Sequence, residues 1–535
     1  MKRILIKNGM VVTGSGEQRQ DILIEGGKIV RIGECGSISV GDDAEVMDVE
    51  GKYVLPGLIE PHMHIKAPLG GITDILDFDS ASKCAAFGGV TTFMDFSSTL
   101  PGDALKDAVS ARLLEMQQKS KQDYSIHCKV VNLVKKESLA LRMLAEVELD
   151  KAKMENDDKM IADAKEKLEK AQNVVDVEVS THLNEIPELI RDGIPTFKLF
   201  MTYRQANVMI DDVYMLQVMK AVKDAGGRCG FHAECNAIAE YNETVFREAN
   251  TLRWEDFPRC KPHLCEEEAV RRVLYYAEML QAPIYFFHIS TKGAVEQIRA
   301  AKARGIDVIA ETCSHYLMMT DEQNKGDDGI LYLMSPPLRK KEDQEALWNG
   351  IADGTISIVT SDNCTFPRWM KEGRLEKKAN RIVQDFTKVI SGVSGIEERL
   401  GLLLSQVGRH EGFTLPALVK VTSENPAKVF GCYPEKGCIA VGSDADLAVI
   451  DLNDNGYRLT LDALHYPKQG DADMDPDKCL EYAIYGDFTA GGRIVHTIRR
   501  GEFLVKNGDY QGEHGVQPVA NGRQIIRRLC LNGKQ

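Results

Sequence analysis

Short apolar runs alternate with longer amphipathic stretches through the middle of the sequence, and this alternation constrains the fold more than any other feature. The runs include VTTFMDF, PTFKLFM, GRCGFHAE, APIYFFHIS, IDVIAE and ISIVTSD. Strands that alternate with helices indicate parallel βαβ units, and about eight such units indicate a closed barrel. We therefore predict an α/β fold with a (β/α)8 barrel of the TIM type over residues 56–430.

Both ends of the chain have a different pattern, in which apolar residues alternate with polar ones between glycine turns. Residues 1–55 contain RILIKNGMVV and QDILIEGGKIVRIG, and residues 431–510 contain GCIAVGSDADLAVIDL and RIVHTIRRGEFLVKNG. Such alternation around NG and GG turns is typical of β-hairpins. We predict one small β-sandwich domain built from both termini, followed by a C-terminal tail at 511–535.

Residues 135–172 interrupt the barrel pattern. They are rich in Ala, Leu, Glu and Lys, contain no Gly or Pro, and place apolar residues at helical spacing. Asn156-Asp157-Asp158 marks a turn halfway along. We predict an inserted helical hairpin on the surface, which is either a solvated insertion or a contact for a partner or a second copy of the chain.

Charge and cysteine content exclude several classes of protein. The formal net charge is −14, from 66 basic and 80 acidic residues, which does not favour nucleic acid or an anionic membrane as a partner. The 13 cysteines are odd in number and form no CxxC pair, as expected of reduced thiols in the cytosol. No stretch reaches the ~20 apolar residues of a membrane span. We expect a soluble cytoplasmic protein that acts on a small molecule.

A set of metal-binding side chains follows the predicted strands. His62 and His64 come directly after the run VLPGLIEP, and residues i and i+2 of an extended chain point the same way. Four further groups belong to separate apolar runs: Lys198, His232, His288 and Asp362. Each alone fits a core histidine, a snorkelling lysine or a capping aspartate. Together, at the rim where barrels keep their active sites, they predict a metal centre.

The donor types restrict which metal this centre binds. Imidazole nitrogens and carboxylate oxygens suit zinc best, with manganese, iron or cobalt as alternatives. A buried lysine ammonium is not a ligand, but the carbamate that Lys198 forms with carbon dioxide, N6-carboxylysine, has two oxygens that bridge two cations. Two cations that share one water push its pKa to neutral or below, since one zinc alone brings it to roughly 7.

At these residues the sequence resembles the hydantoinase/dihydropyrimidinase family of the amidohydrolase superfamily. The matching stretches occur in the order LPGLIEPHMHIKAPLGG, AAFGGVTTFMDF, TFKLFMTY, FHAE, MSPPLR, TSDNCTF, SENPAKVFG and GSDADLAVID. The resemblance implies a hydrolase that opens hydantoin or 5,6-dihydropyrimidine rings to N-carbamoyl amino acids by attack of a metal-bridging hydroxide. It also implies a homotetramer.

Carried over residue by residue, the resemblance implies two divalent metal ions and a role for each matching side chain. One ion is bound by His62, His64 and Asp362, the other by His232 and His288, and both by carboxylated Lys198. Asp362 is also the general base. Tyr203 stabilises the oxyanion, a contribution typically worth ~3–4 kcal/mol. Ser335 fixes the amide edge of the ring.

Three positions depart from the family pattern. Asn363 stands where the family usually has His, and Ile390-Ser391-Gly392 stands where a PNG tripeptide usually lines the substrate edge. Lys66 replaces the Glu or Gln of hydantoinases and occupies the place of an Arg in the related dihydroorotases and allantoinases. We expect Ser391 to contribute backbone groups. We also hypothesise that Lys66 favours a substrate with a polar or anionic substituent.

Two alternatives remain at this point. One is another ring-opening hydrolase, an allantoinase or a dihydroorotase, which keeps the mechanism and changes the substrate. The other is a non-catalytic scaffold, because some dihydropyrimidinase-like proteins keep the fold and lose metal ligands. All six expected ligand positions are filled in this chain, which argues against the scaffold.

Overall fold

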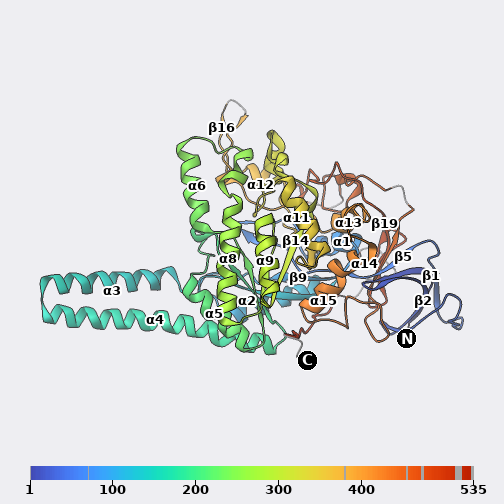
Figure 1. The fold of residues 1–535 in the computed structure, drawn as a ribbon, viewed down its shortest axis with the longest axis horizontal. Coiled ribbons are helices and arrows are strands. Elements are labelled where there is room, and N and C mark those ends of the chain that lie inside the picture. The colour runs from blue at the N-terminus through green and yellow to red at the C-terminus, as the bar shows by residue number, and fades with distance from the viewer. Residues whose placement is uncertain are drawn as a thin grey trace.

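Two large sheets, the helices around the barrel and a long helical arm make up most of the molecule (Figure 1). The computed structural model describes residues 2–69, 71–378, 381–453, 456–471, 475–512 and 521–531. Each sheet has its own apolar core, and the larger of these cores belongs to the barrel. No helix among the described residues is long and apolar enough to cross a membrane.

The central sheet is the predicted barrel of eight parallel strands. Its order follows the sequence: β6 (Leu58–Glu60), β9 (Val90–Phe96), β10 (Asp123–Val130), β11 (Thr196–Phe200), β12 (Arg228–His232), β13 (Ile284–Phe286), β14 (Val308–Cys313) and β15 (Ile358–Thr360). The first and last strands meet just beyond their ends, where Met63 forms a bridge with Asn363 and the His64 amide donates to the Asn363 carbonyl at 2.8 Å. The chain segments that follow β6 and β15 are therefore neighbours.

Helices surround this barrel, as the amphipathic stretches predicted (Figure 1). They include α1 (Phe78–Phe87), α2 (Leu105–Lys119), α5 (Asp212–Asp224), α8 (His263–Leu280), α9 (Lys292–Ala303) and α11 (Lys341–Ala352). Their apolar faces pack on the strands, so that Val218 of α5 and Val273 of α8 share one buried cluster with Phe231 of β12. This packing fixes the strand ends that carry the site.

The second sheet is mixed and draws on both termini, as predicted. From one edge to the other it runs β21 (Asp509–Tyr510), β20 (Glu502–Lys506), β19 (Arg493–Arg499), β18 (Leu447–Asp451), β5 (Tyr53–Pro56), β1 (Arg3–Thr13), β2 (Gly16–Glu25) and β3 (Lys28–Gly33), while β4 (Glu45–Asp48) pairs with β1. The antiparallel pairing of β18 with β5 joins the two ends of the chain.

A buried lysine links this second sheet to the barrel. Lys436 forms ion pairs with Asp123 at the start of β10, with Asp444 at 2.8 Å and with Asp446 at 2.7 Å. The described part of the tail also packs on its own barrel, because the buried Arg527 donates to Ser125 Oγ at 2.8 Å. Barrel, second sheet and tail are thus held together by buried polar contacts.

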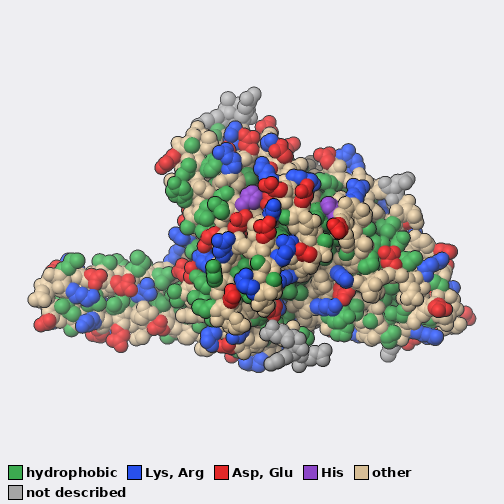
Figure 2. Space-filling view, viewed as in Figure 1, with side chains coloured by type: hydrophobic (Ala, Val, Ile, Leu, Met, Phe, Trp, Pro, Cys, Tyr) green, Lys and Arg blue, Asp and Glu red, His purple; other side chains and the backbone are tan. Residues whose placement is uncertain are grey.

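The inserted hairpin consists of α3 (Lys136–Glu155) and α4 (Asp158–Arg191), which project from the barrel as an arm (Figure 1). The helix α4 continues well past residue 172, because a buried stripe that includes Val175, Ile186 and Leu189 carries it back to the barrel core. Near the tip, Leu149, Ala152 and Ala164 form a small cluster of their own. Figure 2 shows apolar and charged side chains mixed along the surface of the arm.

Candidate metal centre and substrate site

The six expected metal-binding residues all lie at the carboxyl ends of barrel strands. His62 and His64 follow β6, Lys198 is in β11, His232 ends β12, His288 follows β13 and Asp362 follows β15. His288 and Asp362 have positive φ angles of 39° and 47°. Left-handed backbone is costly for such residues and tends to occur at functional sites, where the surrounding fold enforces it.

His62, His64 and Asp362 form the first group of converging atoms. Asp362 Oδ1 lies 3.0 Å from His62 Nε2 and 3.5 Å from His64 Nε2. These ligand atoms all lie within 4.8 Å of one another, which suits a single cation. Lys198 Nζ lies 2.9 Å from His62 Nε2, so the lysine reaches the same point.

His232 and His288 form a second pair. His232 Nδ1 faces His288 Nε2 at 3.0 Å, and the two rings are 4.4 Å apart at their centroids. The His288 ring is also 5.4 Å from the His62 ring, which connects the pair with the first group. The structure therefore brings the expected donors into two adjacent groups, with Lys198 on the side of His62.

Burial and charge set the protonation of these groups. Burial lowers the pKa of His64 to about 4 and the pKa of Lys198 to about 8. Burial opposes ionisation of Asp362 as well, but the neighbouring His62 holds the pKa of this carboxyl well below its usual range. Although burial opposes it, the ionised Asp362 in turn raises the pKa of His62, so this imidazole would give up a proton when a metal binds. His64 is already in the neutral form that metal binding requires, and Lys198 has the less basic amine that carbamate formation requires.

Two glutamates that the sequence did not single out hold the outer nitrogens of the histidines. Glu311 of β14 bonds to His62 Nδ1 and accepts from the Tyr285 hydroxyl at 2.5 Å. Glu234 bonds to His232 Nε2 at 2.7 Å. A carboxylate on one ring nitrogen fixes the tautomer and leaves the lone pair of the other nitrogen for a metal. Glu234 was detectable from its place in FHAE, and Glu311 from its place at the end of the apolar run IDVIAE.

The expected oxyanion donor lies beside this centre. Tyr203 follows β11 with a φ of 67°, and its ring centroid is 5.3 Å from that of His232. Lys261 Nζ donates to Ser335 Oγ and to Glu234, each at 2.9 Å, and lies 5.4 Å from the Tyr203 ring centroid. Lys261 thus connects both expected substrate contacts, Tyr203 and Ser335, with the carboxylate that supports His232.

The other positions that the sequence singled out are Ser391, Lys66 and Asn363, which are not among the proposed metal ligands. Ser391 lies in the segment between residues 389 and 393, next to Asn363, which forms a bridge with Val393. Lys66 pairs with Glu115 at 3.1 Å, so its charge already has a partner at the rim. Asn363 is buried, and its side-chain oxygen accepts from the Gly395 amide at 3.1 Å. Asn363 therefore shapes the chain behind Asp362.

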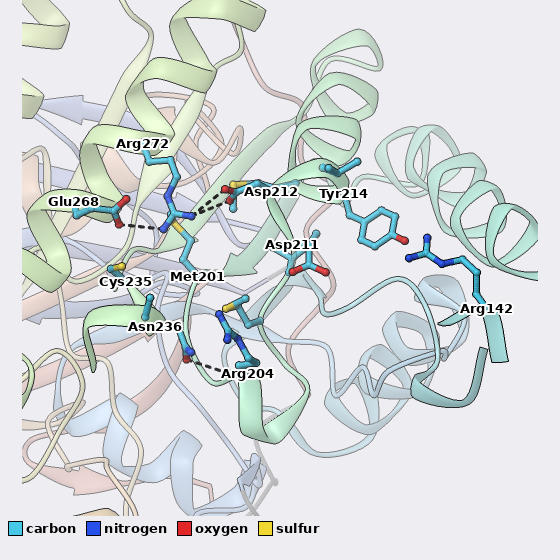
Figure 3. Close-up of a pocket in the computed structure, with 15 residues that line it drawn as sticks. Arg142, Met201, Arg204, Asp211, Asp212, Tyr214, Cys235, Asn236, Glu268 and Arg272 are labelled. Atoms are coloured by element: carbon cyan, nitrogen blue, oxygen red, sulfur yellow. Dashed lines mark hydrogen bonds and ion pairs between the residues drawn. The ribbon is translucent and has the colours of Figure 1, made fainter. Parts of the chain in front are cut away.

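Two other clusters do not belong to this site. Asp123, Asp444 and Asp446 could together hold a cation, but the Lys436 ammonium already lies among them and pairs with all three. A cavity of about 690 Å³ opens beside the loop after β11, between Arg142 of the arm and α8 (Figure 3). Its charged groups mostly pair with one another, as Arg272 does with Asp212 and Glu268.

Comparisons with known proteins agree with this geometry. The model of the amidohydrolase family matches residues 53–504. A D-hydantoinase of Ralstonia pickettii is 32% identical over 513 residues, which cover 95% of this chain and 96% of the relative. A D-phenylhydantoinase of Escherichia coli O1:K1 / APEC is 29% identical over 515 residues, 96% of each chain. The crystal structure of dihydropyrimidinase from Brevibacillus agri is 28% identical, with a TM-score of 0.82 over 99% of each chain.

Proposed function

The chain belongs to the amidohydrolase family, and from that premise we propose that it opens the ring of hydantoins or 5,6-dihydropyrimidines to give N-carbamoyl amino acids. The relatives and the family identify a hydrolase that acts on cyclic amides. The observation that carries the proposal is the convergence of His62, His64 and Asp362 beside Lys198, next to the pair formed by His232 and His288.

These residues fit two divalent cations, with zinc as the best match for imidazole and carboxylate donors and manganese, iron or cobalt as alternatives. His62, His64 and Asp362 would hold one ion and His232 and His288 the other, while Lys198, as N6-carboxylysine, would bridge them. When bound, such ions polarise a carbonyl and lower the pKa of water. Two hydrogen bonds support this fit. Glu311 binds one ring nitrogen of His62 and Glu234 binds one ring nitrogen of His232, which leaves the other nitrogen of each ring for a metal.

Each side chain of the site would then have its own role in the hydrolysis. Asp362 would accept the proton of the attacking water and deliver it to the ring nitrogen as the ring C–N bond breaks. Tyr203 would donate its phenolic hydrogen to the carbonyl oxygen as negative charge develops there, a contribution of ~3–4 kcal/mol for donors of this kind. Ser335 and Ser391 would hold the amide edge of the ring. Each of these roles is a proposal for direct test.

A panel of ring substrates tests the function. We expect protein loaded with zinc or manganese in the presence of bicarbonate to hydrolyse dihydrouracil and substituted hydantoins. Asp362→Asn should lower kcat by roughly 10²–10⁴-fold, because it removes the proposed general base and weakens a proposed metal ligand. A preference for allantoin or dihydroorotate would mean that the proposed mechanism holds but that the natural substrate is a different ring. If metal-loaded protein turned over no ring at all, the function would be wrong.

The same panel tests Lys66 as a specificity residue. The Lys66 ammonium already pairs with Glu115, which weakens its attraction for a substrate anion. We therefore expect only a modest preference for hydantoins with a carboxylate substituent over neutral ones. Lys66→Gln should reduce the ratio of kcat/KM for the anionic ring to kcat/KM for the neutral ring by a few-fold. An unchanged ratio would show that Lys66 serves only to pair with Glu115.

The proposal extends to assembly and location. We propose a homotetramer, as the family resemblance implies, which light scattering after gel filtration would detect at four times the mass of one chain. We also propose a cytoplasmic location, supported by the 13 cysteines, all of which are unpaired.

A further inference from the structure

Lys371 is a buried lysine for which the proposed reaction has no use. It lies in the short helix α12 (Arg368–Glu372), and none of its surface is exposed. Its Nζ donates to three backbone carbonyls, at 2.8 Å to Gly392, 3.3 Å to Leu333 and 3.3 Å to Ile390. No carboxylate in the described part of the chain forms an ion pair with it.

An ammonium group without a counter-ion is costly to bury, and satisfied hydrogen bonds are what offset that cost. The same burial lowers the pKa of Lys371 to about 7. A neutral amine in this place would still donate two hydrogen bonds. The three carbonyls are therefore the reason for a lysine at this position, and they belong to two segments that are far apart in the sequence.

Both segments carry an expected substrate contact. Leu333 comes two residues before Ser335, and Ile390 and Gly392 flank Ser391. The Gly392 amide also donates to the Leu333 carbonyl at 3.1 Å, so a direct bond adds to the lysine bridge. Lys371 thus holds the Ser335 segment and the Ser391 segment at a fixed separation.

The hydrogen bonds of the two residues that flank Ser391 leave its own backbone groups free. The carbonyls of Ile390 and Gly392 and the Gly392 amide are all engaged on the side of Lys371 and Leu333. The N–H and C=O of the half-buried Ser391 have no hydrogen-bond partner among the described residues. A donor beside an acceptor complements the N–H and C=O edge of a cyclic amide.

We propose that Lys371 is a positioning residue, which holds the free backbone N–H and C=O of Ser391 at a fixed distance from Ser335, so that the two segments together bind the amide edge of the ring. This inference rests on the proposed function and assigns to Lys371 a part in substrate binding. It predicts that loss of Lys371 weakens binding of the ring far more than it slows the chemical step.

The test compares Lys371→Met with the wild type and with Lys388→Met, using the ring substrate that the wild type hydrolyses best. Lys388 is partly exposed and bonds to Asp385, so its replacement removes the same charge nearby without touching the two segments. We expect KM to rise at least tenfold in Lys371→Met, kcat to fall less than threefold, and the metal content to stay unchanged. Lys388→Met should match the wild type.

A purely structural role would give a different result. If Lys371 only stabilised the fold, a smaller fraction of molecules would be active, which lowers the apparent kcat at constant KM, and that result would overturn the inference. Lys371→Gln keeps two N–H donors in a neutral group and should have an intermediate KM, which keeps the test decisive if Lys371→Met does not fold. Absence of turnover by the wild type would refute the proposed function, and this inference with it.

Discussion

At the scale of single residues, carboxylates that bond to the histidine rings control how tightly the proposed centre binds metal. Glu311 bonds to His62 Nδ1 and also accepts from the Tyr285 hydroxyl and the His288 amide. One buried carboxylate thus orients a residue from each of the two proposed metal groups. Removing its charge should affect both groups together, although Glu311 itself is no ligand.

Glu311→Gln should therefore reduce metal affinity 10–100-fold, the usual effect of losing a carboxylate that supports a ligating histidine. The amide cannot stabilise the imidazole as a carboxylate does, and one of its two ends is a donor. Competition with a chelator, followed by measurement of bound metal, would give the affinity. Glu322→Gln, which alters an exposed carboxylate bonded to Lys325, serves as the control. Equal affinity in both variants would contradict the prediction.

A second buried carboxyl should make stability depend on pH. Burial raises the pKa of Glu398 from 4.5 to about 8, and Tyr466 donates to its Oε2 at 2.7 Å. The folded state keeps this proton between pH 4.5 and 8, whereas the unfolded state loses it. The group therefore reduces the free energy of unfolding as pH rises through this range, by roughly 1.4 kcal/mol per unit.

Glu398→Gln removes that titration. We expect the variant and the wild type to have similar free energies of unfolding at pH 5, and the variant to be the more stable by at least 1–2 kcal/mol at pH 8. Urea denaturation at the two pH values would measure the difference. Curves with the same pH dependence for both proteins would show that Glu398 is ionised in the folded state.

The sequence predicted that the proposed metal-binding side chains lie together, because each belongs to or follows an apolar run that a barrel places at one rim. The supporting residues were not predictable in the same way. Glu311 ends the run IDVIAE, but it lies 249 residues from His62 and nothing in the sequence pairs the two. Lys371 resembles any surface lysine in the sequence. Only the folded chain shows that their side chains point inward, since burial of a charge depends on partners distant in sequence.

At the scale of elements, the arm formed by α3 and α4 is the main addition to the barrel. The sequence predicted its start and its turn, but not the length of α4, because the stripe that includes Val175 and Leu189 is sparse and Pro187 lies within it. Similarly, β10 was missed because DYSIHCKV mixes polar and apolar residues, yet nearly all of it is buried. In both elements, tertiary contacts outweigh the local pattern.

The outer half of the arm should be dispensable for catalysis. Leu149, Ala152 and Ala164 pack in a cluster separate from the barrel core. We expect deletion of residues 146–168, with Ala145 joined to Glu169 through four glycines, to leave kcat/KM within about twofold and the melting temperature within a few degrees. Activity assays and calorimetry would check this. A large loss of activity would assign the arm a role in the assembled enzyme.

At the scale of the whole molecule, Lys436 joins the barrel to the second sheet. It pairs with Asp123 of β10 and with Asp444 and Asp446 beside β18, and Arg523 of the tail reaches Asp444 at 2.5 Å. With Arg500, which also pairs with Asp123, these three cations balance the three carboxylates, but only while the barrel, the sheet and the tail are docked. We therefore expect the wild type to unfold in a single cooperative transition.

Lys436→Met should leave the buried Asp446 without a counter-ion among the described residues, and breaking a buried pair in this way costs about 3–5 kcal/mol. The expected results are a clearly lower melting temperature and separate transitions for the barrel and the second sheet in differential scanning calorimetry. Lys428→Met, which breaks an exposed pair with Glu424, is the matched control. One transition at the wild-type temperature would contradict this account.

The pairing of the chain ends has a consequence for how the protein is made. Lys52 beside β5 meets Asp451 of β18, and the two are 399 residues apart. At about 5–20 residues per second, a ribosome needs roughly 20–80 seconds to synthesise the intervening chain. Throughout that time the edge of β5 has no partner, which makes the nascent chain a client for chaperones. A message truncated before residue 447 would yield a chain with this edge permanently open, prone to aggregation and proteolysis.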